Sequence, residues 1–300
     1  MTKQKKKDRG LKKWEKETFK QALQMELREH RSSFLVFTVL RILVILTMLR
    51  QLFLQNYEGF FLCILTILLL YLPSWIQVKL RIEIPIGLEI AIMCFVFAAE
   101  ILGEINAFYI VIPFWDTILH TLNGFLCAAI GFSLVILLND SDMEFALSPF
   151  FLAVLAFCFS MTVGVLWEFF EFGVDRLLLM DMQKDTVVSQ ISSVVLDPAG
   201  LNHPVHVKDI VDLMVIHNDG SQEILGLGGY LDIGLIDTIK DLFVNFIGAT
   251  VFSVIGYFYS KYRGKQPIIS MFVPSKKGQE RDYLRKIREA LSLTRDEKDN

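Results

Sequence analysis

The chain has 300 residues, of which 53% are hydrophobic, with a mean hydropathy of +0.45 and a formal net charge of −3. This composition is typical of an integral membrane protein and argues against an ordinary soluble globular domain. The four cysteines, Cys63, Cys94, Cys127 and Cys158, lie in apolar segments without C-x-x-C spacing. They indicate small buried side chains rather than a disulfide framework or a zinc site.

The N-terminal segment 1–32 is rich in Lys and Arg and is predicted to be a basic cytoplasmic tail. Within it, residues 10–32 repeat apolar side chains among Lys and Glu, namely Leu11, Trp14, Phe19, Leu23 and Leu27. This pattern predicts a surface helix on anionic lipid headgroups, with docking to a protein as the alternative. The segment lacks the cleavage site of a signal peptide, so we expect the first membrane span to act as an uncleaved anchor.

Six apolar stretches have the length of about 20 residues that a bilayer requires. They cover residues 33–55, 59–78, 85–104, 114–138, 147–172 and 233–260. The predicted fold is therefore an all-α integral membrane protein with six transmembrane helices. Helices one to five occupy residues 33–175, helix six occupies 233–260, and a charged cytoplasmic tail follows over 261–300.

Positive residues predict the orientation, because Lys and Arg accumulate in cytoplasmic connections. They occur in both terminal segments and as Lys79 and Arg81 between the second and third spans, but not in the connections 56–58 and 105–113. Both termini are therefore predicted to be cytoplasmic. The 139–146 connection falls on the same side although it is acidic. Residues 278–295 are predicted to form a second surface helix, because Tyr283, Leu284, Ile287 and Leu291 recur at helical spacing among charged residues.

The connection 176–232 is predicted to lie outside the cell. Two apolar runs flank the sequence Asn218-Asp219-Gly220-Ser221, which is a strong signal for a β-hairpin, and a further turn is expected at 197–200. A hairpin is marginally stable alone, so we expect it to pack over the outer end of the helices.

Three of the predicted spans carry a stripe of polar side chains on one face. The stripes are Asp116, His120 and Asn123; then Glu168, Glu171 and Asp175; and finally Asp237, Asp241 and Asn245. Residues three, four or seven apart share one face of a helix. The predicted orientation places all three stripes in the outer half of the membrane, and so at one depth.

This layer contains more acids than bases, because its carboxylates face only His120, Lys240 and one or two arginines. Many carboxylates cannot ionise together in a medium of low dielectric without cations. Asp116, His120, Glu168, Glu171 and Asp241 are thus the candidate ligands of a divalent metal ion. Further residues are predicted to line the same pocket. Asn123 and Asn245 would orient the ligands, and Asp175 and Asp237 belong to the pocket. Asp185 and Lys184, in the loop just above, would cap it.

Three functions stay open for this layer. A bound metal could act on envelope or lipid-linked substrates at the outer leaflet, protonatable carboxylates could couple transport to a cation or proton, or the polar groups could only hold a non-catalytic scaffold together. Whether the protein is an enzyme, and which residues would be catalytic, is left open. The lipid bilayer is the expected partner and nucleic acid is not; the composition does not predict an oligomeric state.

Over residues 85–260 the chain resembles the YjdF-like family of bacterial membrane proteins, and more distantly the VanZ-like proteins. The resemblance is carried by Asp116-x-x-x-His120, Glu168-x-x-Glu171, Gln183-Lys184-Asp185 and Asp237-Thr238-x-x-Asp241, which continues to Gly248-Ala249. It implies a multi-pass protein of the bacterial plasma membrane and, for the VanZ-like group, a link to the cell envelope. Glu171 departs from the VanZ-like pattern, in which a Gln is expected.

Overall fold

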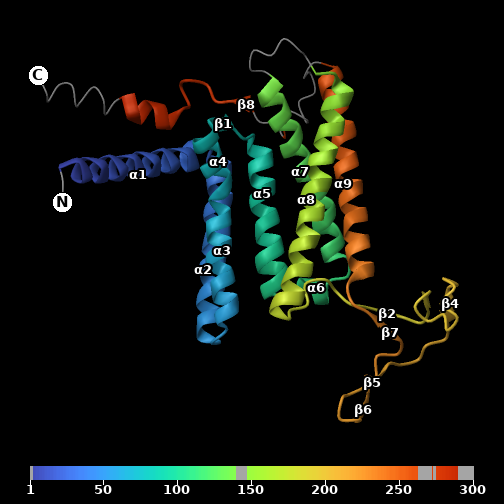
Figure 1. The fold of residues 1–300 in the computed structure, drawn as a ribbon. Coiled ribbons are helices and arrows are strands. Elements are labelled where there is room, and N and C mark those ends of the chain that lie inside the picture. Colours follow the sequence, from blue (N-terminus) through green and yellow to red (C-terminus); the bar gives the residue numbers. More distant parts are fainter. Residues whose placement is uncertain (1–2, 140–146, 263–271, 273–274, 290–300) are drawn as a thin grey trace, which may run out of the picture. The chain divides into compact units, whose positions relative to one another are not determined.

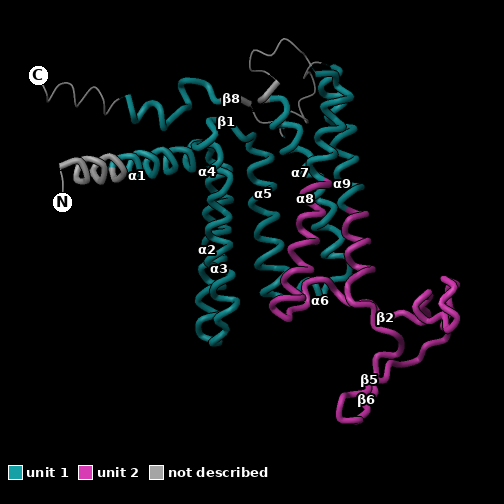
Figure 2. Tube along the Cα trace, in the orientation of Figure 1, with its two compact units in different colours: residues 1–160, 245–300 teal, residues 161–244 magenta. Residues whose placement is uncertain are grey.

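The computed structural model describes residues 3–139, 147–262, 272 and 275–289. The acidic connection 139–146 lies outside the described residues except for Asn139. The end of the second predicted surface helix, from residue 290 on and including Leu291, also lies outside them. The chain consists of two compact units: unit 1 contains residues 1–160 and 245–300, and unit 2 contains residues 161–244 (Figure 2). Helices α8 and α9 each contribute residues to both units.

The six predicted membrane spans are confirmed by six helical segments of sufficient length and hydropathy. Their bounds differ from the predicted ones by a few residues, most at the end of the fifth span, where the helix extends by almost two further turns. They are α2 (Arg31–Phe53), α3 with α4 (Tyr57–Leu70 and Leu72–Leu80), α5 with the π-helix η1 (Ile86–Phe97 and Ala98–Ile105), α7 (Trp115–Asn139), α8 (Pro149–Leu178) and α9 (Leu235–Lys261). The short α6 (Phe108–Val111) precedes α7.

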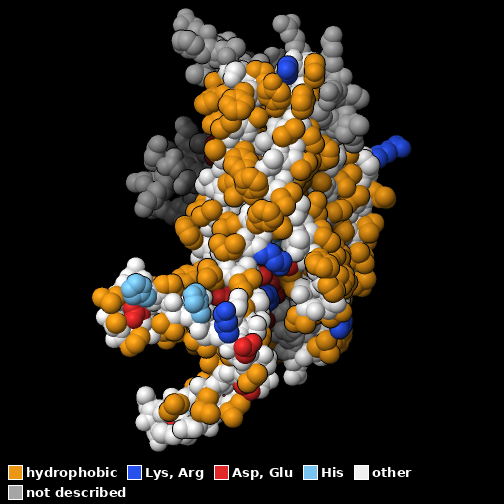
Figure 3. All heavy atoms as spheres, turned by 90° about the vertical axis from the view of Figure 1, so that its right-hand side faces the viewer, with side chains coloured by type: hydrophobic (Ala, Val, Ile, Leu, Met, Phe, Trp, Pro, Cys, Tyr) orange, Lys and Arg blue, Asp and Glu red, His pale blue; other side chains and the backbone are white. Residues whose placement is uncertain are grey.

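Hydrophobic side chains cover most of the visible helical surface, as Figure 3 shows. Many of them are exposed, such as Leu46, Leu68 and Phe243, at 58%, 63% and 62%. Soluble proteins rarely expose so large an apolar area, whereas lipid tails accept it. The chain is therefore a multi-pass membrane protein whose helices contact the lipid bilayer.

In unit 1, α2, α3, α5 and η1 pack around one apolar cluster, which includes Phe37, Val44, Leu70 and Met93. Cys63 is buried in this cluster, as predicted, but Cys94 and Cys158 are exposed on apolar helix surfaces and Cys127 is half-buried. The prediction that all four thiols are buried is therefore wrong for two of them. A membrane helix can turn an apolar side chain toward lipid as readily as toward protein.

The two terminal segments of unit 1 contact each other and the connection between the second and third spans. Helix α1 (Lys3–Glu29) runs crosswise to α2 and α3 and extends sideways from their end near α4 (Figure 1). It packs on α4 and on the helical residues 283–289 through Ala22, Val78 and Leu284. Strand β1 (Ile82–Glu83) pairs antiparallel with β8 (Ser275–Lys276). The first predicted surface helix is helical up to Glu29, and the second is helical over 283–289 but not over 278–282. The two helical segments pack on each other.

The connection within unit 2 forms short antiparallel strand pairs. Strand β2 (Thr186–Val188) pairs with β7 (Tyr230–Asp232), β3 (Ile191–Ser193) with β4 (Val205–Val207), and β5 (Met214–Ile216) with β6 (Gln222–Ile224). The last pair is the predicted hairpin, and Gly220 supplies the positive φ of 82° that its turn requires. The predicted turn at 197–200 is also present, because the Asp197 carboxylate accepts hydrogen bonds from the backbone N–H groups of Ala199, Leu201 and His203.

Candidate functional site

Within unit 1, Gly124 of α7 lies close to the backbone of α9 and accepts a hydrogen bond from α8. A Cβ atom on Gly124 would lie 2.1 Å from the carbonyl oxygen of Asn245 in α9, so only glycine fits. The carbonyl oxygen of Gly124 accepts a hydrogen bond of 2.7 Å from Ser160 Oγ in α8. Small residues at helix crossings allow this approach in membranes, where polar side chains then link the helices.

Contacts on either side of Gly124 show that α7 and α9 run parallel. Asn123 Nδ2 donates to Asn245 Oδ1 at 3.2 Å. Further along both helices, Phe125 packs edge-on against Phe252, with ring centroids 5.1 Å apart, and Phe132 packs against Tyr259 at 6.3 Å. The residue numbers rise together on the two helices. The predicted amides Asn123 and Asn245 are therefore brought together, and Asn245 is only 1% exposed.

Asp116 and His120 lie one helical turn apart near the start of α7. Asp116 Oδ1 is 3.4 Å from His120 Nε2, and both side chains are largely buried, at 24% and 13% exposed. The pair therefore presents a carboxylate oxygen, which is a hard metal ligand, and an imidazole nitrogen, which is a ligand of borderline hardness, on one face of the helix. These are ligand types that divalent transition metals accept.

Unit 2 holds the remaining acids of the predicted layer. In α8, Glu168 and Glu171 are 4% and 8% exposed, and Glu171 Oε1 accepts a hydrogen bond of 2.9 Å from Trp167 Nε1. In α9, Asp241 is 1% exposed. The ammonium group of Lys240 lies 3.7 Å from Asp237 Oδ1 and 3.9 Å from Asp241 Oδ1. The exposed Lys240 thus offsets part of the negative charge of this helix end.

Asp175 and Asp237 hold the turn that follows α8. Asp175 accepts hydrogen bonds from the backbone N–H groups of Met182 and Gln183, at 2.6 and 2.9 Å. Asp237 accepts one from the backbone N–H of Lys184 at 2.8 Å. The amide of Gln183 donates to Thr238 Oγ1 at 2.6 Å. The sequence motifs around residues 183–185 and 237–238 are therefore joined by hydrogen bonds, and we call this set of contacts the loop latch.

Gly234 completes the loop latch. Its φ is +87°, and a Cβ atom there would lie 2.7 Å from Gln183 Cβ. Asp185, predicted to cap the pocket, is exposed at the edge of the latch. Although the residue is exposed, slight desolvation of its carboxyl group and the nearby carboxylates of Asp181, Asp232 and Asp175 raise the pKa of Asp185 above its ordinary value.

Sequence reasoning missed Gly124, Ser160, Trp167 and Gln183 as residues that position this layer. A signal exists for the first two, because small residues facing the polar stripe mark a close helix crossing. The hydrogen bonds of Trp167 and Gln183 carry no comparable signal, since they depend on the rotamers and loop path of the folded chain.

No curated protein and no solved structure matches this chain. A family model described as "Predicted membrane protein (DUF2238)" matches residues 34–262, which is most of the chain, and the chain therefore belongs to this family of predicted membrane proteins.

Proposed function

We propose that this membrane protein binds a divalent metal ion in the layer formed by the three polar stripes. Asp116, His120 and Asp241 are its first ligands, each offering one carboxylate oxygen or imidazole nitrogen. Glu168 and Glu171 supply further carboxylates. The observation that carries the proposal is the hydrogen bond between Asn123 and Asn245, because it sets the register of α7 against α9.

Helix periodicity extends that register toward the start of both helices. His120 precedes Asn123 by three residues, or about 4.5 Å, and Asp241 precedes Asn245 by four, or about 6 Å. Positions 116, 120 and 123 share a face of α7, and positions 241, 245 and 248 share a face of α9. The faces that meet at the two asparagines therefore carry His120 and Asp241 at nearly the same depth.

The same reasoning supports the place of the glutamates of α8. Ser160 meets α7 at Gly124. Glu171 follows Ser160 by eleven residues, close to three helical turns, so it shares the face of Ser160, and Glu168 lies about 80° to one side of that face. Glu168 lies about 12 Å beyond Ser160, and Asp116 lies about 12 Å from Gly124 toward the start of α7.

A metal ion would relieve the excess of acid in this layer. Carboxylates in a low dielectric persist when they are paired or coordinate a cation. Several carboxylates with one imidazole suit Zn²⁺, Mn²⁺ or Fe²⁺, and Mg²⁺ if water completes the shell. Asn123 and Asn245 orient the ligands from behind. A bound ion would make a water molecule acidic and so support hydrolysis of envelope or lipid-linked substrates at the outer leaflet.

The proposed setting is a bacterial plasma membrane with both termini in the cytoplasm, consistent with the YjdF-like resemblance. The contacts of α1 with residues 277–289 support a common side for the two terminal segments. The basic N-terminal tail would then face anionic lipid headgroups.

The test is elemental analysis of the full chain purified in detergent and incubated with Zn²⁺ or Mn²⁺. We expect near-stoichiometric metal in the wild type. In His120→Ala and Asp241→Asn, each of which removes one proposed ligand, the bound metal per protein should fall by roughly tenfold or more. His217→Ala is the matched control, because His217 is an exposed histidine in the hairpin beside Glu223. A wild type that retains no metal, or a His120→Ala variant that retains as much as the control, would refute the proposal.

A further inference from the structure

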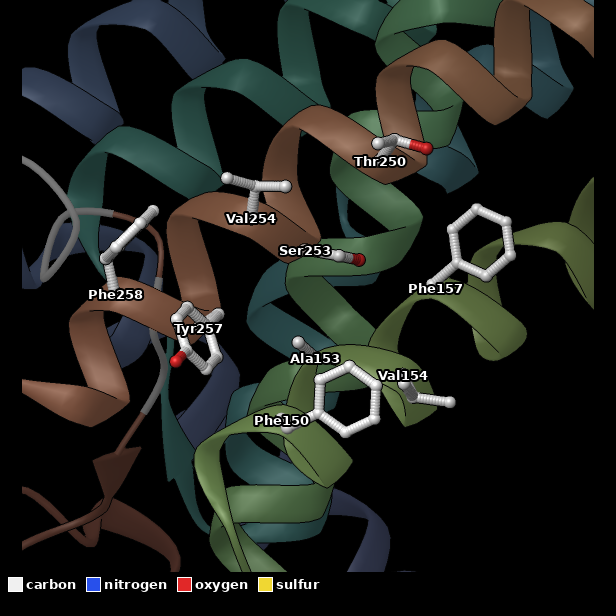
Figure 4. A pocket seen from close by; sticks show the side chains of 9 residues that line it. All are labelled: Phe150, Ala153, Val154, Phe157, Thr250, Ser253, Val254, Tyr257 and Phe258. Carbon is white, nitrogen blue, oxygen red and sulfur yellow. The ribbon is translucent and has the colours of Figure 1, made fainter.

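An apolar groove lies within unit 1 between the first turns of α8 and the last turns of α9 (Figure 4). Its volume is about 380 Å³, within the range of small-molecule sites. The α8 wall consists of Phe150, Ala153, Val154 and Phe157, and the α9 wall of Thr250, Ser253, Val254, Tyr257 and Phe258. None of the side chains that line the groove is acidic.

One polar group of the groove has an unmet hydrogen-bonding need. Ser253 is 7% exposed, and among the described residues no group forms a hydrogen bond with its Oγ. In Figure 4 its hydroxyl points from α9 toward α8. A buried hydroxyl without a partner costs about 1–3 kcal/mol, so a carbonyl oxygen that entered the groove would be held there.

Lys261 brings a positive charge to one end of the groove, one helical turn beyond Tyr257 in α9. Its Nζ lies 5.4 Å from the centre of the Tyr257 ring, and Tyr257 lines the groove. Tyr262 follows, stacked on Phe258 at 6.2 Å. Tyrosines and lysines at the end of a membrane helix mark the headgroup region. The groove therefore begins at headgroup level and runs into the hydrocarbon layer.

We propose that this groove binds one anionic phospholipid of the leaflet at the Lys261 end. The ammonium of Lys261, which lies over the Tyr257 ring, contacts the lipid phosphate. The Ser253 hydroxyl, about one turn or ~6 Å deeper than Tyr257, donates to an ester carbonyl, and the aromatic walls hold the first methylene groups. The lipid enters sideways, because Phe150 and Val254 at the rim are 69% and 50% exposed. This assignment is independent of the metal layer.

Native mass spectrometry of the full chain, titrated with phosphatidylglycerol or phosphatidylcholine, tests the proposal. We expect the wild type to prefer phosphatidylglycerol by about fivefold, the effect of one lysine near a phosphate. Lys261→Gln should abolish that preference. Ser253→Ala should weaken binding of both lipids several-fold. It should not lower thermal stability in lipid-free detergent, since no described residue forms a hydrogen bond with the hydroxyl.

Val154→Trp fills the groove and should remove the bound lipid, whereas Phe151→Trp, on an exposed part of α8 that does not line the groove, should keep it. Equal binding of the two lipids by the wild type, or unchanged lipid binding in Val154→Trp, would overturn the proposal. So would loss of a dimer in Val154→Trp without loss of lipid, because the groove would then bind a second copy of the chain.

Discussion

Two buried glutamates in unit 1 are held by different kinds of partner. Glu89 accepts hydrogen bonds from Ser33, from Ser74 at 3.4 Å and from Gln77 at 3.3 Å. Glu26 instead forms an ion pair with Lys277, and both side chains are 3% exposed. Hydroxyl and amide groups can hydrogen-bond a carboxyl group in either protonation state. Lys277 attracts the ionised carboxylate of Glu26, but this attraction only partly offsets the cost of burying that charge.

The pKa of Glu26 gives a pH-dependent contact between α1 and the C-terminal segment. Burial raises this pKa from 4.5 to about 7, against the opposing effect of Lys277. Because the folded pKa exceeds the unfolded one, the stabilisation is complete below about pH 4.5 and is lost as the pH rises through 7. We expect the contact to weaken by about 1–3 kcal/mol between pH 5 and 8, the upper figure applying if water is fully excluded.

Spin labels at Lys20→Cys and Glu280→Cys, in a background in which the native cysteines are replaced, would report this contact through their distance distribution. Glu26→Gln should remove the pH dependence, and Glu17→Gln, on the exposed face of α1, should retain it. A distribution that stays constant from pH 5 to 8 in the wild type would contradict the expected titration.

At the scale of elements, the approach of α7 to α9 is set by two glycines. Gly124 lies against the carbonyl of Asn245, and Gly248 lies against that of Thr121, where an added Cβ would be 2.0 Å away. A backbone carbonyl cannot move aside as a side chain can. The asparagine hydrogen bond, and with it the proposed metal layer, depends on this close contact.

We therefore expect Gly124→Ala to separate α7 from α9 and to destabilise the protein by about 1–3 kcal/mol, the usual cost of overpacking. Thermal unfolding in detergent, followed by size-exclusion chromatography, measures the effect. The control is Gly173→Ala in α8, where an added Cβ meets no atom within 4 Å. That variant should be neutral or slightly stabilised, since alanine favours the helix. Equal stability of the two variants would show that the close contact does not limit the packing.

At the scale of the whole molecule, the chain consists of membrane helices, a terminal assembly and a connection with short strand pairs. The terminal assembly joins α1, β1 and residues 275–289 through paired strands and the ion pairs of Arg281 with Glu29 and Glu83. Contact requires these three segments to share one side of the membrane. In the proposed orientation, the six spans place the connection 176–232 on the opposite side.

Cysteine labelling in intact cells measures that arrangement. In a background without the native cysteines, Asn218→Cys in the hairpin turn should react with an impermeant maleimide from outside. Gln279→Cys in the C-terminal segment should react only after the cells are opened. Labelling of both positions from outside would contradict the proposed orientation, and with it the outer depth of the acidic layer.

Sequence patterns identified the elements well because their signals are local. Apolar length predicted the six spans, the Asn-Asp-Gly-Ser turn predicted the β5–β6 hairpin, and helical spacing placed each polar stripe on one face. The pairs β2–β7 and β3–β4 were not predicted, because strands of three residues are too short to show a period.

The sequence by itself determined the number of spans, the hairpin and the helix faces that carry the acids, since helix periodicity and bilayer thickness act along the chain. Only the tertiary structure decided that α7 and α9 run parallel with Asn123 opposite Asn245, that the terminal segments pack on each other, and that a groove opens between α8 and α9. These features depend on which small residues allow two backbones to approach and on which side chains then meet, and contacts between residues more than a hundred positions apart leave no local pattern.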